Sequence, residues 1–238
     1  SDNYTISVTV TDDDTGSDSE TAPLTVSNVA PVLVLNAVPG INENGTATLS
    51  GTVTDPGTQD TFTVLVDWGD GSAAQTFTYA AGTTAFSETH QYLDDNPTAT
   101  ASDNYTISVT VTDDDTGSDT ETATVTVSNV APALILNAVP GIDENGTVTL
   151  SGTYHDVGTQ DTHTLTIDWG EGAPVTLAVT GGTFSFVHQY LDDNPTGSAS
   201  DVVTISATLT DDDTGTDSKS TTSTITNVAP VIDTLVAT

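Results

Sequence analysis

The chain has 238 residues, of which 34 are Asp or Glu and one is Lys or Arg, so its formal net charge is −33. A surface this negative repels phosphate, which excludes nucleic acid as a partner and excludes simple adsorption to anionic lipid. The chain has no Cys, hence no disulfide framework and no Cys-based metal site. No apolar run approaches the roughly 18 residues of a membrane-inserted span. The expected partner is a cation.

Stretches in which apolar residues alternate with Thr or Ser recur along the chain. Thr5–Thr11, Thr61–Asp67, Thr124–Ser128 and Thr162–Asp168 follow this period of two, which is typical of strands with one buried face. Thr itself favours strands. The hydrophobic content of 35% is low enough to suggest disorder, but the alternation argues against it and predicts an all-β fold.

The strongest feature of the sequence is an internal repeat. Ser1–Asp18 recurs without a change at Ser102–Asp119 and returns in looser form at Ser200–Asp217. Units of about 100 residues with short strands and frequent turn signals are typical of immunoglobulin-like sandwiches. The sequence therefore predicts tandem seven-stranded immunoglobulin-like β-sandwiches in a linear array.

The repeat boundaries divide the chain into four parts. We expect the last two strands of a preceding repeat in residues 1–29, complete sandwiches in 30–129 and 130–227, and the first strand of a following repeat in 228–238. In the first complete sandwich the expected strands are Leu33–Ala37, Thr46–Thr54, Thr61–Trp68, Ala74–Tyr79, Thr84–Thr89, Tyr105–Thr112 and Thr120–Ser128.

Four motifs follow one another in the first complete repeat: DWGDG at Asp67–Gly71, HQY at His90–Tyr92, the Tyr105–Ser118 stretch and SNVAP at Ser128–Pro132. In this order they resemble a PKD (polycystic-kidney-disease) domain. The resemblance implies seven-stranded sandwiches, found in tandem in bacterial surface and secreted proteins, often with bound calcium and without catalysis. The SNVAP linker is also locally similar to cadherins, in which an Asn-containing stretch before Pro ligates calcium between domains.

The acidic residues fall in loops, and because strands alternate in direction, these loops gather at the two ends of each sandwich. At the first pole we expect Asn28, Asp55, Asp60, Asp113, Asp114, Asp115 and Asp119 in one repeat, and Asn129, Asp156, Asp161, Asp211, Asp212, Asp213 and Asp217 in the next. At the second pole we expect Glu43, Asp70, Asp94 and Asp95, and correspondingly Glu144, Glu171, Asp192 and Asp193.

Converging carboxylates without basic neighbours need another neutralising charge, because each close pair repels by about 1 to 4 kcal/mol, depending on the effective dielectric. Oxygen-only ligands suit a hard cation, so these residues are candidate calcium ligands. The alternative is a solvated acidic face that only confers solubility. We favour calcium because three loops distant in sequence bring acids to one pole in both complete repeats.

The histidines carry weaker signals. His90 and His188 stand beside tyrosines in HQY and are interpreted as residues that support a loop corner. His155 and His163 occur only in the second complete repeat, so they indicate no repeated chemistry.

The predicted function is a calcium-stiffened structural repeat of a long extracellular adhesin, stalk, fibre or surface-layer protein, with neighbouring repeats of the same or like chains as partners. The alternative is an accessory polysaccharide-binding module of a secreted enzyme. Exposure of Trp68, Trp169, Tyr79 and Tyr154 discriminates between the two, because sugar stacking needs exposed rings whereas core tryptophans are buried. Nothing in the sequence suggests an enzyme.

Overall fold

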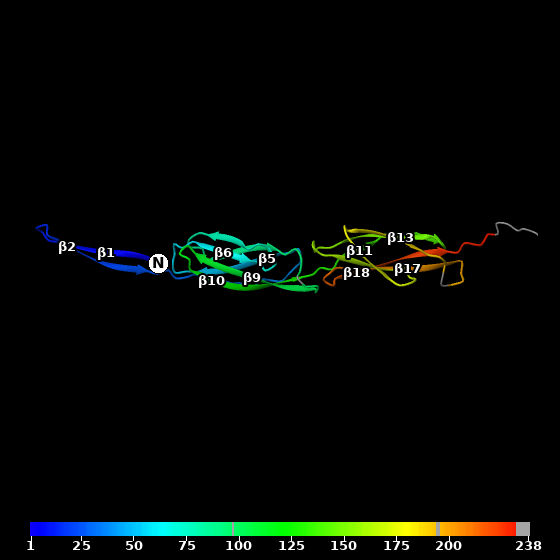
Figure 1. Ribbon diagram of the computed structural model, residues 1–238, viewed down its shortest axis with the longest axis horizontal. Coiled ribbons are helices and arrows are strands. Elements are labelled where there is room, and N and C mark those ends of the chain that lie inside the picture. Colours follow the sequence, from blue (N-terminus) through cyan, green and yellow to red (C-terminus); the bar gives the residue numbers. More distant parts are fainter. Residues whose placement is uncertain (97, 194–195, 232–238) are drawn as a thin grey trace, which may run out of the picture. The chain divides into compact units, whose positions relative to one another are not determined.

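The computed structural model describes residues 1–231 except 97, 194 and 195, and this part of the chain forms 18 strands and no helix (Figure 1). It therefore has no helix long and apolar enough to cross a membrane. The all-β prediction is confirmed. The strand expected in 228–238 falls largely outside the described residues and stays a prediction.

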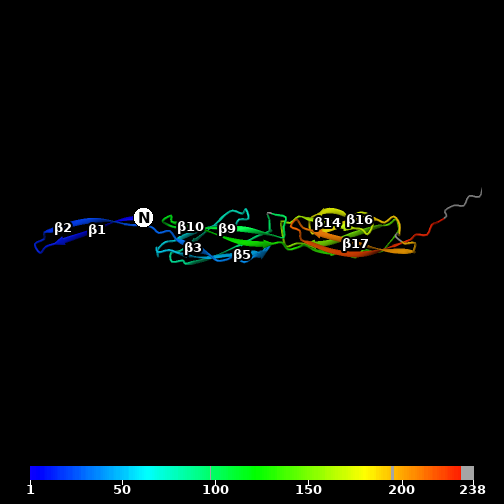
Figure 2. The same ribbon diagram turned by 90° about the horizontal axis from the view of Figure 1, so that it is seen from below.

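Each complete repeat is a sandwich of two sheets (Figure 2). In the first repeat the three-stranded sheet has the order β3-β5-β8 and the five-stranded sheet has the order β4-β10-β9-β6-β7. Their bounds are β3 Val32–Leu35, β4 Ile41–Asn42, β5 Thr46–Thr54, β6 Phe62–Asp67, β7 Gln75–Tyr79, β8 Ala85–Gln91, β9 Ser102–Asp113 and β10 Ser118–Ser128.

The second repeat has the same topology, with sheets β11-β13-β16 and β12-β18-β17-β14-β15. This is the immunoglobulin-like arrangement that the sequence predicts. The bounds are β11 Ala133–Leu136, β12 Ile142–Asp143, β13 Thr147–His155, β14 His163–Asp168, β15 Val175–Val179, β16 Thr183–Gln189, β17 Ser200–Thr210 and β18 Thr216–Thr226.

The strand expected at Leu33–Ala37 is present as β3 but is shorter than expected, because the chain then crosses to the opposite sheet. β3 ends at Leu35, and the two residues of β4 then pair in parallel with the end of β10 in the opposite sheet. Pro39 lies between the two segments and has no N–H to donate to a ladder, so a single strand cannot continue through it. The switch places Glu43 directly after β4.

The alternating pattern builds the core. In β9 the side chains of Ile107, Val109 and Val111 are fully buried. Leu165 and Ile167 of β14 are likewise fully buried in the second repeat. Each such side chain contributes roughly 1.5–3 kcal/mol relative to an exposed one.

The first hairpin is different. β1 (Asp2–Thr11) and β2 (Ser17–Val26) pair in register, yet Ile6 is 50% exposed although the identical sequence buries Ile107 completely. Within the described residues this apolar face is uncovered.

By internal contacts the described chain divides into two compact units. The first contains Ser1–Gly40, Thr46–Gln91 and Asn104–Thr126, and the second contains Ile41–Gly45, Tyr92–Asp103 and the chain from Val127 onward. Two loop segments of the first complete repeat therefore group with the second repeat.

Candidate metal centre

The run of three aspartates in each DDDTG loop begins with a residue that holds the turn. Asp113 accepts the Gly117 N–H at 2.7 Å through one carboxylate oxygen and the Asn28 side-chain amide at 2.8 Å through the other. These bonds support Thr116, whose φ of 74° lies in the left-handed region that side chains usually avoid. Holding this turn therefore requires an aspartate only at Asp113, the first of the three aspartates in the DDDTG loop.

The second repeat copies this turn. Asp211 accepts the Gly215 N–H at 2.6 Å, and the Asn129 side-chain amide donates to its other oxygen at 3.0 Å. The predicted ligands Asp113, Asp211, Asn28 and Asn129 thus make internal bonds.

Other first-pole acids fasten loops to strands. Asp114 accepts the Thr61 N–H at 2.9 Å and Asp119 accepts the Leu33 N–H at 2.8 Å. Asp212 and Asp217 make the same bonds to the backbone of Thr162 and Leu134 in the second repeat. Asp217 also pairs with Lys219 at 2.6 Å, and this partner lowers its pKa. Asp115 is exposed and joins none of the acidic groups below.

The most buried acidic group consists of Glu43, Asp94 and Asp95. Their side chains are 1%, 6% and 0% exposed, and one oxygen from each lies within 4.8 Å of the others. Glu43 is placed by two backbone bonds: its N–H donates to the Ser128 carbonyl at 2.9 Å, and one of its carboxylate oxygens accepts the Val130 N–H at 2.6 Å. All these residues belong to the second compact unit.

Several oxygen atoms of this region are buried without a hydrogen-bond partner among the described residues. They are Glu43 Oε2, both carboxylate oxygens of Asp95, both of Asp161, and Asn129 Oδ1. Burial raises the pKa of Glu43 to about 7 and that of Asp95 to about 7. The pKa of Asp161 rises to about 8, again first through burial and then through the Glu43 charge.

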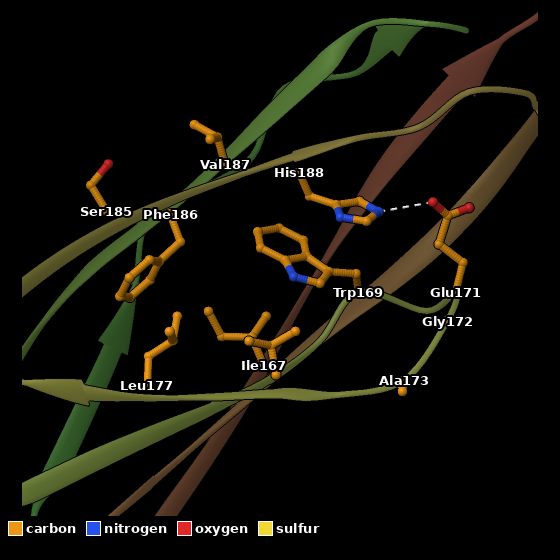
Figure 3. A pocket seen from close by; sticks show the side chains of 11 residues that line it. Ile167, Trp169, Glu171, Gly172, Ala173, Leu177, Ser185, Phe186, Val187 and His188 are labelled. Carbon is orange, nitrogen blue, oxygen red and sulfur yellow. Dashed lines mark hydrogen bonds and ion pairs between the residues drawn. The ribbon is translucent and has the colours of Figure 1, made fainter.

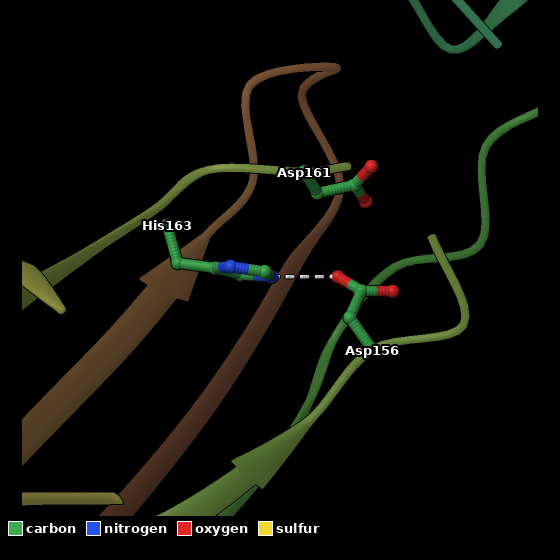
Figure 4. A group of neighbouring side chains, drawn as sticks. All are labelled: Asp156, Asp161 and His163. Atoms are coloured by element: carbon green, nitrogen blue, oxygen red, sulfur yellow. Dashed lines mark hydrogen bonds and ion pairs between the residues drawn. The ribbon is translucent and has the colours of Figure 1, made fainter. Parts of the chain in front are cut away.

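A second group is linked to the first through a shared residue. Asp94 also lies with Asp161 and Asp213, and these three carboxylates again approach within 4.8 Å of one another. Asp161 in turn lies with Asp156 and His163 (Figure 4). Sequence reasoning set His163 aside, although its position two residues after Asp161 was a usable signal.

Two further groups of carboxylates lie at the first pole of the first repeat and at the second pole of the second repeat. Asp55 and Asp60 lie with Asp113 in the first repeat, where one Asp55 oxygen is buried and has no partner within the described residues. At the far end of the second repeat the group is Glu144, Asp192 and Asp193. Glu144 accepts the Val228 N–H at 2.8 Å, as Glu43 accepts that of Val130.

Asp70 and Glu171 are second-pole acids that stand apart from these groups. Asp70 bonds to His90 at 2.7 Å and Glu171 bonds to His188 at 2.8 Å. Burial is the largest single influence and acts to raise the pKa of Asp70, but the bonds from His90 and Ser72 together outweigh it and the net shift is downward. Both acids therefore orient a histidine.

Those histidines in turn cover the tryptophans. His188 stacks on Trp169 with ring centroids 4.8 Å apart and 13° between the planes, and Glu171 holds the far side of the imidazole (Figure 3). Trp68 is 0% exposed and Trp169 is 5% exposed. The adjoining cavity of about 460 Å³ is lined by apolar residues such as Ile167, Leu177 and Phe186. Neither indole offers an open face to a sugar, so both tryptophans are core residues and the alternative of a stacking platform is not formed by these rings.

The carboxylates of Glu43, Asp94, Asp95, Asp161 and Asp213 form an oxygen-rich cluster that could hold a hard cation, and the described residues place no basic side chain beside it. Calcium takes six to eight oxygen ligands at about 2.3–2.6 Å from carboxylates, carbonyls and water. The buried oxygens without partners supply such ligands, and the sole basic side chain, Lys219, is committed to Asp217.

No family model matches the chain and no curated protein matches it, so the resemblance to PKD domains rests on the motifs alone. Among solved structures, the tetra-tandem repeat in the extending region of a large adhesion protein is 19% identical with a TM-score of 0.49, covering 94% of this chain and 56% of that one. Protocadherin Gamma B2 extracellular cadherin domains 1–5 are 14% identical with a TM-score of 0.32, covering 98% and 47%. The chain spans about half the length of each, and this degree of similarity does not transfer a function.

Proposed function

We propose that the chain is a non-catalytic, calcium-stiffened structural repeat of a long extracellular adhesin, stalk, fibre or surface-layer protein. The observation that carries the proposal is the group of Glu43, Asp94 and Asp95. Asp95 is 0% exposed, and the side-chain group that its carboxylate meets is another acid, Asp213, rather than an N–H donor or a cation.

A buried carboxylate without a partner costs several kcal/mol, so it either binds a proton or meets a cation. The raised pKa values of Glu43 and Asp95 describe the first outcome. Calcium provides the second, because a divalent ion neutralises two carboxylates and is attracted by the others. A merely solubilising acidic surface would leave such side chains in water.

The position of the group supports stiffening as its role. It joins Glu43 and the Asp94–Asp95 loop to Asp161 and Asp213 of the second repeat, all within one compact unit. These residues are far apart in sequence, so an ion shared among them restricts several loops at once. The repetition of the unit, loops included, with Ser1–Asp18 recurring unchanged at Ser102–Asp119, indicates that the array itself is the selected property.

An extracellular setting is part of the proposal, because it is where a calcium site of modest affinity is filled. Extracellular calcium modules bind with dissociation constants of about 10⁻⁴–10⁻³ M, which only the outside of a cell saturates. The alternative of a polysaccharide-binding module loses the tryptophans among its four discriminating aromatic residues because both are buried, whereas Tyr79 and Tyr154 are half-buried.

The test is thermal melting of the whole chain with calcium and with chelator. Calcium is expected to raise the melting temperature of the wild type, and Asp95→Asn to reduce that rise. Glu121→Gln is the matched control, because it removes the same charge from an exposed position in β10. Equal melting temperatures in calcium and chelator, together with no calcium retained on metal analysis, would refute the proposal.

A further inference from the structure

The second repeat contains one acidic group that includes a histidine. Asp156 follows β13, His163 begins β14, and Asp161 lies in the connection between them (Figure 4). One ligand atom from each lies within 4.8 Å of the others. His163 Nε2 is 2.8 Å from Asp156 Oδ2, and the two side chains are only 8% and 4% exposed.

Unpartnered oxygens converge on the same place. Both Asp161 oxygens are buried and have no hydrogen-bond partner in the described part of the chain. Glu43 is 1% exposed, and its Oε2 has no partner among the described residues. This oxygen and the Asp161 carboxylate both lie against Gly158, where a side chain would point. A Cβ at Gly158 would collide with both carboxylates, so glycine keeps this space open for them.

The first repeat lacks the imidazole at this place but keeps the acids. Asp55, Asp60 and Phe62 stand where the second repeat has Asp156, Asp161 and His163, each pair being 101 positions apart. Phe62 is 5% exposed and belongs to the core. Asp55 Oδ2 consequently stays without a partner among the described residues, whereas the equivalent Asp156 oxygen bonds to His163.

We propose that Asp156, Asp161 and His163 bind a borderline divalent cation of the zinc class, in the second repeat only. Imidazole is a ligand for zinc, copper, iron and nickel and is foreign to calcium, whereas carboxylate serves both classes. One nitrogen and two carboxylates match the three protein ligands that zinc takes when water fills a fourth position.

The group needs little adjustment to accept the ion. Two ligand bonds of about 2.0–2.1 Å at a tetrahedral angle separate the donor atoms by about 3.3 Å, so His163 and Asp156 must part by roughly half an ångström. The neutral imidazole binds the metal through the Nε2 lone pair with its one ring proton on Nδ1, so a proton held at Nε2 moves to Nδ1 through solvent, and only a doubly protonated ring releases a proton. A cavity of about 540 Å³ adjoins the group and is lined by Asp156, Asp161 and His163 among others.

This site goes beyond the calcium proposal and is separable from it. It shares Asp161 with the oxygen-only groups, but His163 belongs to it alone, and Asp95 belongs only to the calcium group. His163→Phe installs the side chain that the first repeat has at this position, so the core is expected to accept it. His155→Thr likewise installs the Thr54 of the first repeat and serves as the matched histidine control.

The experiment titrates the whole chain with zinc near neutral pH, using calorimetry and side-chain NMR of the four histidines. We expect the ring signals of His163 to move first. In His163→Phe the zinc affinity should fall by more than about 100-fold, since loss of outer-shell partners alone costs roughly 10- to 100-fold. His155→Thr and Asp95→Asn should keep the zinc site, and His163→Phe should keep the calcium-induced rise in melting temperature.

Unchanged His163 signals, or equal zinc affinity in wild type and His163→Phe, would overturn the assignment and leave the calcium proposal standing. The reciprocal variant Phe62→His guards against a folding failure of His163→Phe. It places an imidazole beside the unpartnered Asp55 oxygen and Asp60, and it should create a second zinc site in the first repeat. A folded Phe62→His protein with no added zinc binding would count against the proposed ligand set.

Discussion

Without calcium, the stability of this protein should fall as pH rises through neutrality, in contrast to proteins whose carboxylates are ion-paired. Burial raises the pKa of Glu43 and Asp95 to about 7 and that of Asp161 to about 8. In the unfolded chain carboxyl groups titrate near pH 4. Between these limits the folded state holds protons that the unfolded state has lost.

The sign and the size of the effect follow from proton linkage. Stability decreases with pH wherever the folded state binds more protons, by at most about 1.4 kcal/mol per pH unit for each proton. The stabilising contribution of these three acids is therefore complete below about pH 4 and is lost as pH rises to about 7–8. The share of Asp161 is discounted for solvent screening, because the residue as a whole is only half-buried although its carboxylate oxygens are covered.

If calcium binds as proposed, it should reverse this trend, because it would bind the deprotonated acids. At a hundredfold excess over its dissociation constant, an ion that binds only the folded state adds about 2.7 kcal/mol. For one repeat of about 100 residues, 2.7 kcal/mol corresponds to a rise of about 10 °C or more in melting temperature. The rise should be small near pH 5 and large near pH 8, and binding near pH 6 should release protons.

The assay is calorimetric melting of the whole chain from pH 5 to pH 9, in chelator and in millimolar calcium. Asp95→Asn should flatten the decline in chelator, whereas Glu121→Gln should leave it unchanged. A melting temperature in chelator that rises or stays level from pH 5 to pH 8 would show that the buried acids are not held protonated, and the reasoning would fail.

Three further outcomes are expected. Leu165→Ala removes a fully buried side chain and should lower the free energy of unfolding, measured in denaturant, by about 2–5 kcal/mol. Val175 is 44% exposed, so Val175→Ala should change the same quantity by less than about 0.5 kcal/mol. Asp113→Ala leaves the Gly117 N–H and the Asn28 amide without their acceptor and should cost about 1–3 kcal/mol, a loss detectable by the same measurement. Amide hydrogens of β1 should exchange much faster than those of the identical sequence in β9, because an isolated hairpin is marginal in water; equal protection would contradict the exposure of its apolar face.

The strands were predictable because the alternation of Thr with apolar residues fixes both the element and its buried face. β5 runs from Thr46 to Thr54 as expected, since its pattern is uninterrupted. The two-residue β4 was not predictable, because two residues carry no periodicity and their pairing partner lies 86 positions away in the chain. The gathering of acids at the ends of the sandwiches follows from strand direction alone.

What sequence could not resolve is how each carboxylate is used. Asp113 and Asp114 are neighbours of the same type, yet the first caps a turn and the second fastens a strand. Asp70 was grouped with Asp94, but it orients His90 instead. These differences depend on which backbone N–H or imidazole lies within 3 Å of an oxygen, and that information arises only from tertiary packing.

The uneven use of the acids is the strongest physical argument for bound cations. Carboxylates such as Asp113, Asp119 and Asp217 meet backbone or side-chain donors, so folding itself compensates their burial. Asp95 and Asp161 meet none within the described residues, although exposed positions for negative charge are abundant on so acidic a chain. A sequence under pressure only for solubility would place its acids in water, where they cost nothing. Because these two are instead buried beside other carboxylates, we expect the folded state to take up protons or metal ions there, and its stability to depend on the ionic composition of the surrounding medium.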